Sequence, residues 1–289
     1  MKIRFFIYSL IVLFVVAACE REVTFDLPDS ERALVVDGRI EEGSIAYVIL
    51  THSTSFYGAI GLDNAEDFFV PNATVKVSDG EQEIELFELV IDTLGQQGIL
   101  YVDLFGQMIG EAGKNYTLTI EAEGQTLTST TQIPNTLPLD SVWWEPQTIG
   151  DNDSLARVFV TLSDPDTLGN YYRYFTQYND ESMLPGLNST FDDLLINGLT
   201  FPTPIDKAET RLDSINFEYY GFFNLGDEVT VRLSGIDENV YDFWNTLEAN
   251  TQSGGPFSGI TVIKGNVENA LGVWGGYGVQ EISISIPKE

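Results

Sequence analysis

The chain has 289 residues, with 44 Asp or Glu against 14 Lys or Arg, so its formal net charge at pH 7 is −30. Such a negative field repels phosphate backbones, which excludes nucleic acid as a partner. Hydrophobic residues make up 43% of the chain, which argues against wholesale disorder, and the length suffices for two domains of ordinary size.

Residues 1–18 have the features of a secretory signal peptide. Lys2 and Arg4 precede an apolar run that begins at Phe5 and ends at Val16, and two alanines follow. A transmembrane helix needs about 20 apolar residues, whereas this run is shorter and ends at a small-residue cleavage region. We therefore expect the segment to be cleaved.

Cys19 is the only cysteine, and it directly follows Val16, Ala17 and Ala18. These residues resemble the lipobox of bacterial lipoproteins, so we predict that Cys19 carries the acyl lipid and that residues 19–32 form a tether. Two or more acyl chains anchor a protein stably in a membrane. The acidic stretch 20–22 resembles export signals for the cell surface, and we expect a surface-exposed protein anchored to the outer membrane.

Residues 33–133 contain short alternating runs with turn residues between them. Seven strands within about 100 residues indicate an immunoglobulin-like β-sandwich. Tyr116 lies at the start of one run, as in a tyrosine corner, which gives it a structural role. The predicted strands are 33–40, 46–51, 73–78, 83–89, 99–104, 115–122 and 125–132.

A proline-bounded segment, 133–138, reads as a linker because proline removes backbone donors from strand pairing. We place a domain boundary there and predict a larger β-rich domain over 139–289. Apolar residues at spacings of three and four predict one helix near 238–249, packed on the sheet. The overall class is therefore mainly β. The predicted strands are 140–145, 155–163, 170–178, 215–223, 228–233 and 280–286.

The alternating pattern decays between residues 182 and 210, where Pro185, Pro202 and Pro204 occur. A short helical turn near 191–195 is the only element we expect in this insertion. Long insertions in compact domains are often functional, so the segment is a candidate ligand or partner loop, with a plain variable connection as the alternative.

The sequence contains few residues that could carry out catalysis. His52 is the only histidine, and no serine occupies a Gly-x-Ser-x-Gly turn. With Cys19 acylated, zinc also lacks ligands. Acidic residues around the strand 155–163 do not match the EF-hand spacing, so we read them as solvated turn residues. We predict no catalytic residues, metal or cofactor, although a carboxylate pair for glycoside hydrolysis stays an open alternative.

Aromatic residues crowd two parts of the second domain. Large rings on both faces of a strand indicate a sheet covered on both sides, which favours core packing over a ligand platform. Glycines of the tail 254–277 are expected to allow turns with positive φ and close backbone approach. If a ligand site exists, its candidate residues are Tyr172, Tyr174, Trp274 and Tyr277.

Several stretches together resemble a family of Bacteroidota-type lipoproteins, the domain of unknown function 4249. They are residues 34–40, 48–51, 139–142, 227–248 and 254–277. The resemblance implies an accessory lipoprotein of a TonB-dependent receptor with a role in nutrient capture or envelope transport, and it implies no reaction. Together with the absence of catalytic histidine or cysteine chemistry, it leads us to expect a non-enzymatic protein whose ligand is a small molecule, a glycan or a peptide. A glycoside hydrolase and a structural or adhesive envelope module are the alternatives. The resemblance assigns no site residues.

Overall fold

Strands dominate the structure. A computed structural model of the chain describes residues 32–54, 67–93, 96–135, 137–210, 215–252 and 262–288. These ranges all belong to one compact unit, which begins at Arg32. The predicted signal peptide, Cys19 and almost all of the tether lie outside the described residues. In the described ranges, no helix has both the length and the apolar character needed to cross a membrane.

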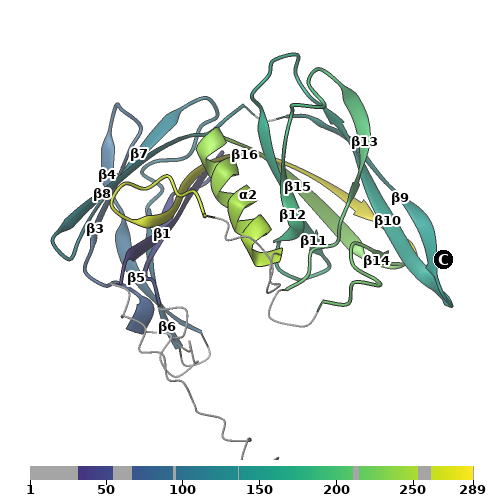
Figure 1. The fold of residues 1–289 in the computed structure, drawn as a ribbon, viewed down its shortest axis with the longest axis horizontal. Helices are drawn as coiled ribbons and strands as arrows, with labels where there is room; N and C mark the ends of the chain where they lie inside the picture. Colours follow the sequence, from purple (N-terminus) through teal and green to yellow (C-terminus); the bar gives the residue numbers. More distant parts are fainter. Residues whose placement is uncertain are drawn as a thin grey trace, which may run out of the picture. The chain divides into compact units, whose positions relative to one another are not determined.

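The N-terminal half is a sandwich of two four-stranded layers (Figure 1). One layer has the order β1-β2-β6-β5 and the other β4-β3-β7-β8. Read along the chain, this is the A-B-E-D and C′-C-F-G arrangement of an immunoglobulin fold, so the predicted topology is confirmed. The strands are β1 (Leu34–Glu41), β2 (Tyr47–His52), β3 (Thr74–Ser78), β4 (Glu83–Glu85), β5 (Phe87–Thr93), β6 (Gln96–Val102), β7 (Asn115–Ala122) and β8 (Gln125–Gln132).

Two local features of this sandwich concern residues 83–89 and Tyr116. Residues 83–89 form two strands rather than one, because the chain changes layers at Leu86, which is buried between them: β4 pairs with β3 and β5 pairs with β6. The tyrosine corner is present, since the hydroxyl of Tyr116 accepts a hydrogen bond of 2.8 Å from the backbone N–H of Glu111.

The C-terminal half adds a second layered arrangement and one helix. Its smaller sheet has the order β13-β10-β14, with β9 also paired to β10. The mainly β class with a packed helix is thereby confirmed. The elements are β9 (Leu139–Ile149), β10 (Asn152–Ser163), β11 (Tyr171–Tyr178), β12 (Leu184–Asp192), β13 (Thr200–Ile205), β14 (Phe223–Asn224), β15 (Glu228–Ile236), α2 (Glu238–Gln252) and β16 (Leu271–Ser285).

A single eight-stranded sheet contains strands from both halves, in the order β12-β11-β15-β16-β1-β2-β6-β5. The joint is the parallel pairing of β16 with β1, in which Trp274 is the register partner of Gly38. The buried residues nevertheless form one cluster mainly within residues 34–133 and another within 137–286, and a third, smaller cluster lies between α2 and the sheet. The predicted boundary at 133–138 stays a prediction, and a continuous sheet spans it.

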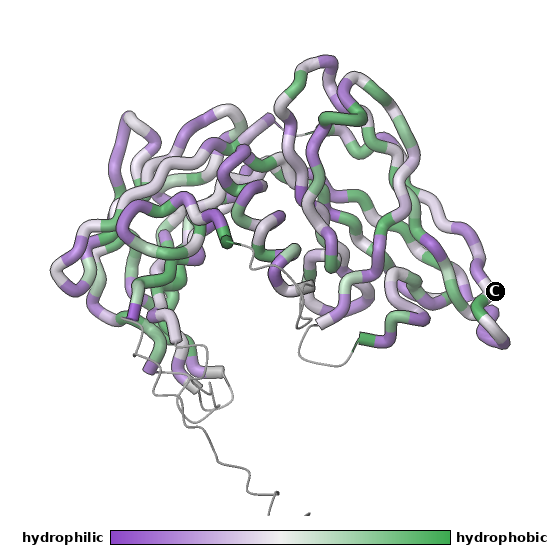
Figure 2. Tube along the Cα trace, viewed as in Figure 1, coloured by the Kyte–Doolittle hydropathy of each residue, from purple (hydrophilic) through white to green (hydrophobic). Residues whose placement is uncertain are grey.

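The two faces of this long sheet have different covers. Because side chains alternate along a strand, Trp274 points into the N-terminal core whereas Val273 and Tyr277 point toward α2. Figure 2 shows hydrophobic and hydrophilic residues alternating along many strands. Asp237 caps α2, since its Oδ1 accepts the N–H of Val240 at 3.0 Å. The helix therefore lies on one face of the long sheet, and the N-terminal and C-terminal buried clusters lie on the other face.

Three sequence predictions in this half were wrong. The insertion at 182–210 contains β12 and β13 with turns at 194–198 between them, rather than a helical turn and loop. Pro202 and Pro204 are tolerated because β13 is an edge strand paired on one side only, with β10. Residues 215–223 form turns up to β14 instead of a strand. The last strand begins at Leu271, not at 280.

The glycine residues of the tail explain why the last strand begins at Leu271 and not at residue 280. Gly272 has a φ of +104°, and a Cβ atom there would lie 1.9 Å from the main-chain oxygen of Val36. Close backbone approach was expected from the sequence and is confirmed. It occurs within the β1–β16 pairing rather than in a turn, because glycine lets two backbones approach where a side chain would clash.

Candidate functional site

A pocket of about 420 Å³ opens beside α2, and we call it the α2-face pocket. Its walls come from β1, β2, β11, the start of β12, the last turns of α2, and β16. It therefore combines residues from both halves of the chain. The helix-covered face of the long sheet forms its base, which fixes the polar side chains described below on rigid elements.

Asp37 is one of three acidic residues that line this pocket, with Glu209 and Glu248. Its side chain is exposed to solvent within the pocket, and no hydrogen bond or ion pair joins it to another described residue. Burial among the surrounding protein atoms raises the pKa of Asp37, while the charges of Arg39 and Arg173 act in the opposite direction. The carboxylate is thus available to a ligand but poorly solvated.

Arg39 follows two residues later on β1, on the same face of the sheet. Its guanidinium lies 4.1 Å from the ring centroid of Tyr277. The Nη2 atom lies 2.5 Å from Oε1 of Glu41, an ion pair that falls outside hydrogen-bond geometry. Both Nε and Nη2 are buried and have no hydrogen-bond partner among the described residues. Buried donors of this kind are rare in proteins. Glu41 supplies an ionic partner for Nη2, whereas Nε has none among the described residues.

Arg173 and Glu248 form the frame of the pocket. Both side chains are 5% exposed, and Nη2 of Arg173 lies 3.7 Å from Oε1 of Glu248. Glu248 also accepts the N–H of Ser189 at 2.9 Å, while Nε of Arg173 donates to the Ser189 hydroxyl at 3.0 Å. The guanidinium stacks over Trp244, 3.6 Å from its centroid. Burial lowers the pKa of Arg173, and Tyr277 and Glu248 oppose this.

The pocket belongs to a chain whose sequence matches a known family model. That model, Domain of unknown function (DUF4249), matches residues 20–283. The chain belongs to the DUF4249 family. The family resemblance inferred from short stretches of sequence is therefore confirmed. No curated protein matches this DUF4249 chain.

The four aromatic residues predicted for a ligand site are all buried in this DUF4249 protein. Trp274 is fully buried in the N-terminal core, and Tyr172 and Tyr174 pack in the C-terminal core. Only Tyr277 reaches the α2-face pocket, beneath Arg39. Tyr172 and Tyr174 each reach the wall of a different pocket. Ligand binding by these residues stays a prediction.

Sequence reasoning missed Asp37 and Arg39, although their signal was present. Residues 34–40 read Leu-Val-Val-Asp-Gly-Arg-Ile, with two opposite charges at alternate positions of an otherwise apolar strand. Charged side chains on one face of a central strand indicate that this face is not part of a dry core. Their proximity to Tyr277 could not be read from the sequence, because it depends on the parallel pairing of β1 with β16.

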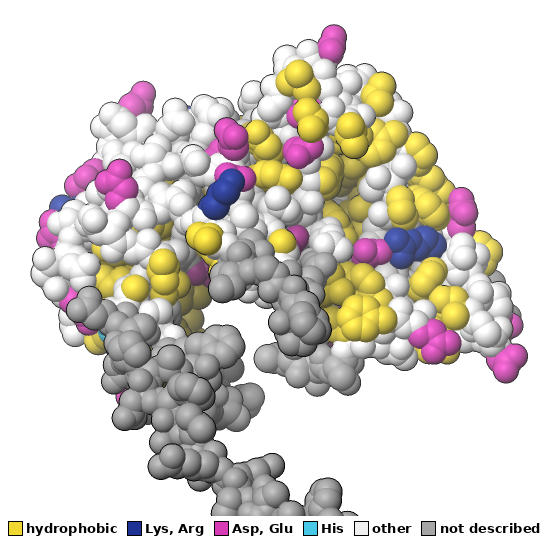
Figure 3. Space-filling view, in the orientation of Figure 1, with side chains coloured by type: hydrophobic (Ala, Val, Ile, Leu, Met, Phe, Trp, Pro, Cys, Tyr) yellow, Lys and Arg dark blue, Asp and Glu magenta, His cyan; other side chains and the backbone are white. Residues whose placement is uncertain are grey.

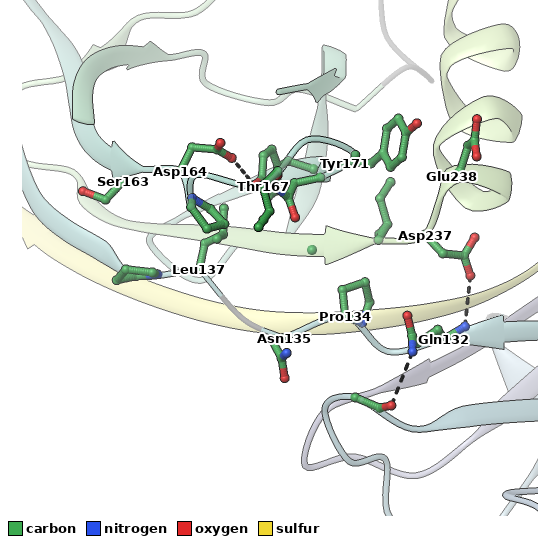
Figure 4. Close-up of a pocket in the computed structure, with 18 residues that line it drawn as sticks. Gln132, Pro134, Asn135, Leu137, Ser163, Asp164, Thr167, Tyr171, Asp237 and Glu238 are labelled. Carbon is green, nitrogen blue, oxygen red and sulfur yellow. Dashed lines mark hydrogen bonds between the residues drawn. The ribbon is translucent and has the colours of Figure 1, made fainter. Parts of the chain in front are cut away.

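A larger pocket, of about 870 Å³, lies between the linker, the β10–β11 connection and the start of α2 (Figure 4). Its carboxylates have internal partners: Asp237 accepts the N–H of Gln132 at 3.0 Å, and Asp164 accepts the hydroxyl of Tyr172 and the N–H of Gly198. In the described ranges, no buried side-chain polar atom that lacks a partner belongs to this pocket. Its polar groups therefore serve the fold.

Among the residues with described structure, no group of three or more His, Cys, Asp or Glu could hold a metal ion. His52 pairs with Glu123, with 3.1 Å between Nε2 and Oε1. Of the acids interpreted as solvated turn residues, Asp151, Asp153 and Asp166 are exposed, although Asp153 lies in β10. The interpretation was wrong for Asp164, which is buried and accepts hydrogen bonds from the Tyr172 hydroxyl and the Gly198 N–H. That the chain binds no metal stays a prediction.

Proposed function

We propose that this DUF4249 protein is a non-enzymatic lipoprotein, anchored to the outer membrane and exposed at the cell surface, that captures a small ligand for a TonB-dependent receptor. The observation that carries the proposal is the α2-face pocket. In it the carboxylate of Asp37, which has no partner among the described residues, and the guanidinium of Arg39 lie at alternate positions of one strand. Charged groups without partners in a concave site are typical of ligand binding.

The pocket has the dimensions and the construction of a small-molecule site. Its volume of about 420 Å³ lies in the range of ligand pockets. Phe175, Trp244 and Tyr277 supply aromatic walls, and the buried Arg173–Glu248 pair holds the strand β11 against α2. A preorganised site of this kind loses little entropy when a ligand binds.

The charge of the protein surface argues against anionic partners. Acidic side chains are scattered over the face in Figure 3, whereas Lys and Arg appear there at few places. With a net charge of −30, anionic lipid surfaces repel the body of the protein, so a lipid must hold it at a membrane. The lipobox-like residues before Cys19 support that anchor, and the family resemblance supports the receptor partner.

The test is an affinity purification of the tagged protein from detergent-solubilised outer membranes, with protein partners and released small molecules identified by mass spectrometry. We expect a stoichiometric TonB-dependent receptor and a small molecule that Arg39→Gln does not retain. Cys19→Ala should leave the membrane fraction, while Arg232→Gln, a cation outside the pocket, should retain both partner and ligand. Recovery of the protein alone, without receptor or ligand, would contradict the proposal.

A further inference from the structure

We propose that the outer edge of β5 is a docking surface for an extended segment of a partner protein, which adds to the sheet as a further strand and carries apolar and basic side chains. β5 is the last strand of the eight-stranded sheet, and in the described part of the chain no other strand pairs with its outer side. It lies with β6 at the lower end of the N-terminal sandwich in the view of Figure 1. The inference goes beyond ligand capture, because it names a second binding surface and the chemistry of its partner.

The edge strand exposes apolar side chains on both of its faces. Every residue from 87 to 92 is exposed, and the exposed fractions of Phe87, Leu89, Val90 and Ile91 lie between 37% and 54%. Because side chains alternate along a strand, Val90 lies on the face opposite to the other three. Contiguous exposed apolar residues with polar neighbours are typical of interaction sites.

The apolar surface continues beyond the strand. Phe105 is 73% exposed, and its ring meets that of Phe87 edge to face, with 5.0 Å between the ring centroids. Leu104, beside it in the chain, is also exposed. A partner that pairs with the backbone of β5 can therefore bury aromatic surface as well.

The edge lacks features that usually prevent strand addition. Edge strands in native proteins are commonly protected by lysine, proline or a β-bulge. Residues 87–93 contain neither lysine nor proline, and they pair with β6 without a shift in register. By contrast, the edge strand β13 contains Pro202 and Pro204. An unprotected edge presents a row of backbone donors and acceptors, and another extended chain is the partner that matches this row.

Two carboxylates determine the charge of the partner. Glu88 and Asp92 lie on the same face of β5 as Val90, because each is two residues away from it. The Glu88 carboxylate is held at the edge, since its Oε2 accepts the N–H of Asn72 and lies 3.0 Å from the Tyr101 hydroxyl. Opposite charges in cross-strand positions stabilise a strand pair. We therefore expect Lys or Arg in the partner opposite these two positions.

A second copy of this chain does not match the edge. The antiparallel register that pairs all of residues 87–93 with themselves places Glu88 directly opposite Asp92 at two positions. Like charges directly opposite each other destabilise a strand pair, and two copies of net charge −30 also repel each other. A basic partner strand replaces these repulsions by attractions.

The experiment uses the full chain purified in detergent and a synthetic peptide as the probe. The peptide is Val-Lys-Ile-Thr-Ile-Lys-Val with blocked ends, and its lysines fall opposite Glu88 and Asp92 in either direction of pairing. Calorimetry measures the affinity, and hydrogen exchange followed by mass spectrometry locates the backbone N–H groups that the peptide protects. We expect binding, with the added protection concentrated in residues 87–93.

Control peptides separate strand addition from general charge attraction. Glutamate in place of both lysines should weaken binding at least about tenfold, since two attractive cross-strand pairs become repulsive. The order Lys-Lys-Val-Val-Ile-Ile-Thr keeps the composition and the charge but loses the alternation of side chains. N-methylation of every residue removes the backbone donors. Both changes should also weaken binding at least about tenfold, because each prevents a regular strand pair.

A pair of variants tests the position of the surface. Val90→Lys places a cation on the edge of β5, which should weaken binding of the lysine peptide at least about tenfold. Thr126→Lys, on the edge strand β8, is the matched control and should leave the affinity unchanged. Both replaced side chains are exposed, so we expect both variants to fold. The control peptides test the inference on the parent protein if Val90→Lys fails to fold.

Four results would overturn the inference: no binding of the lysine peptide, equal binding of the lysine and glutamate peptides, added protection outside β5, or a dimer in sedimentation analysis that Val90→Lys converts to a monomer. The last result would assign the edge to a second copy of the chain. Ligand capture is tested separately, because Val90→Lys should still retain the small molecule of the α2-face pocket.

Discussion

The indole Nε1 of Trp274 donates a hydrogen bond of 2.9 Å to the main-chain oxygen of Tyr116, 158 residues earlier in the chain. The donor comes from the last strand and the acceptor from the tyrosine corner of the N-terminal sandwich. The side-chain Oδ1 of Asn266 also accepts the backbone N–H of Trp274, at 2.9 Å. The final strand is thus an integral part of the N-terminal core.

Replacing this tryptophan should destabilise the N-terminal half. Trp274→Phe removes buried volume and leaves the Tyr116 oxygen without its donor, so we expect the free energy of unfolding to fall by about 2 kcal/mol or more. Urea denaturation followed by circular dichroism measures this. The matched control is Trp143→Phe on β9, where the ring is half-buried, and an equal loss in both variants would contradict the interpretation.

The close approach of β16 to β1 should depend on Gly272. Gly272→Ala combines a φ of +104° with a Cβ only 1.9 Å from the oxygen of Val36, so the two strands must separate. Gly80→Ala is the control, because Gly80 also has a positive φ, of +88°, but nothing within 4 Å of an added Cβ. Thermal denaturation should show that the free energy of unfolding falls by about 1–2 kcal/mol in the control and by clearly more in Gly272→Ala. Equal losses would mean that the clash is relieved without cost.

Asp237 joins α2 to the N-terminal sandwich. Its carboxylate caps the helix at Val240 and also accepts hydrogen bonds from the Thr131 hydroxyl and the Gln132 N–H. We expect Asp237→Ala to lower the unfolding free energy by about 2–3 kcal/mol, because three donors lose one acceptor. Chemical denaturation tests this against Asp153→Ala, an exposed acid. A change below about 0.5 kcal/mol would show that water replaces the carboxylate.

Stability should fall in strongly alkaline solution, in part through Tyr101. Its hydroxyl donates to the oxygen of Val70 at 2.7 Å and accepts the N–H of Ala73 at 3.1 Å, and burial raises its pKa from 10.0 to about 12. The protonated form is favoured in the folded state. Its contribution is therefore complete below pH 10 and is lost as the pH rises through 12, because the unfolded chain releases the proton first.

The measurement for Tyr101 compares urea denaturation at pH 8 and pH 11. Tyr101→Phe should be less stable than the parent at pH 8, by about 1 kcal/mol for the lost hydrogen bonds. It should also lose less stability than the parent between the two pH values. The same loss in both proteins would assign the alkaline sensitivity to other tyrosines, such as Tyr241, whose pKa burial also raises to about 12.

Local sequence patterns determined much of the fold. Alternation placed most strands, the spacing of apolar residues placed α2, and Gly113 to Ile120 indicated the tyrosine corner. These features depend on residues close together in the chain, so a pattern of period two or 3.6 is enough to find them. The family was also found from short stretches, and the match over residues 20–283 confirmed it.

Only the tertiary structure revealed the remaining strands and the pocket, because both depend on pairing between strands that are distant in the chain. Proline and scattered apolar residues hid β12 and β13, whose partners lie elsewhere in the chain. Glycines that suggested turns instead allow β16 to pair in parallel with β1, across more than two hundred residues. That pairing brings Arg39 over Tyr277 and Asp37 into the pocket beside α2. No local pattern encodes it, since the register of a parallel pair is set by packing against the whole sheet.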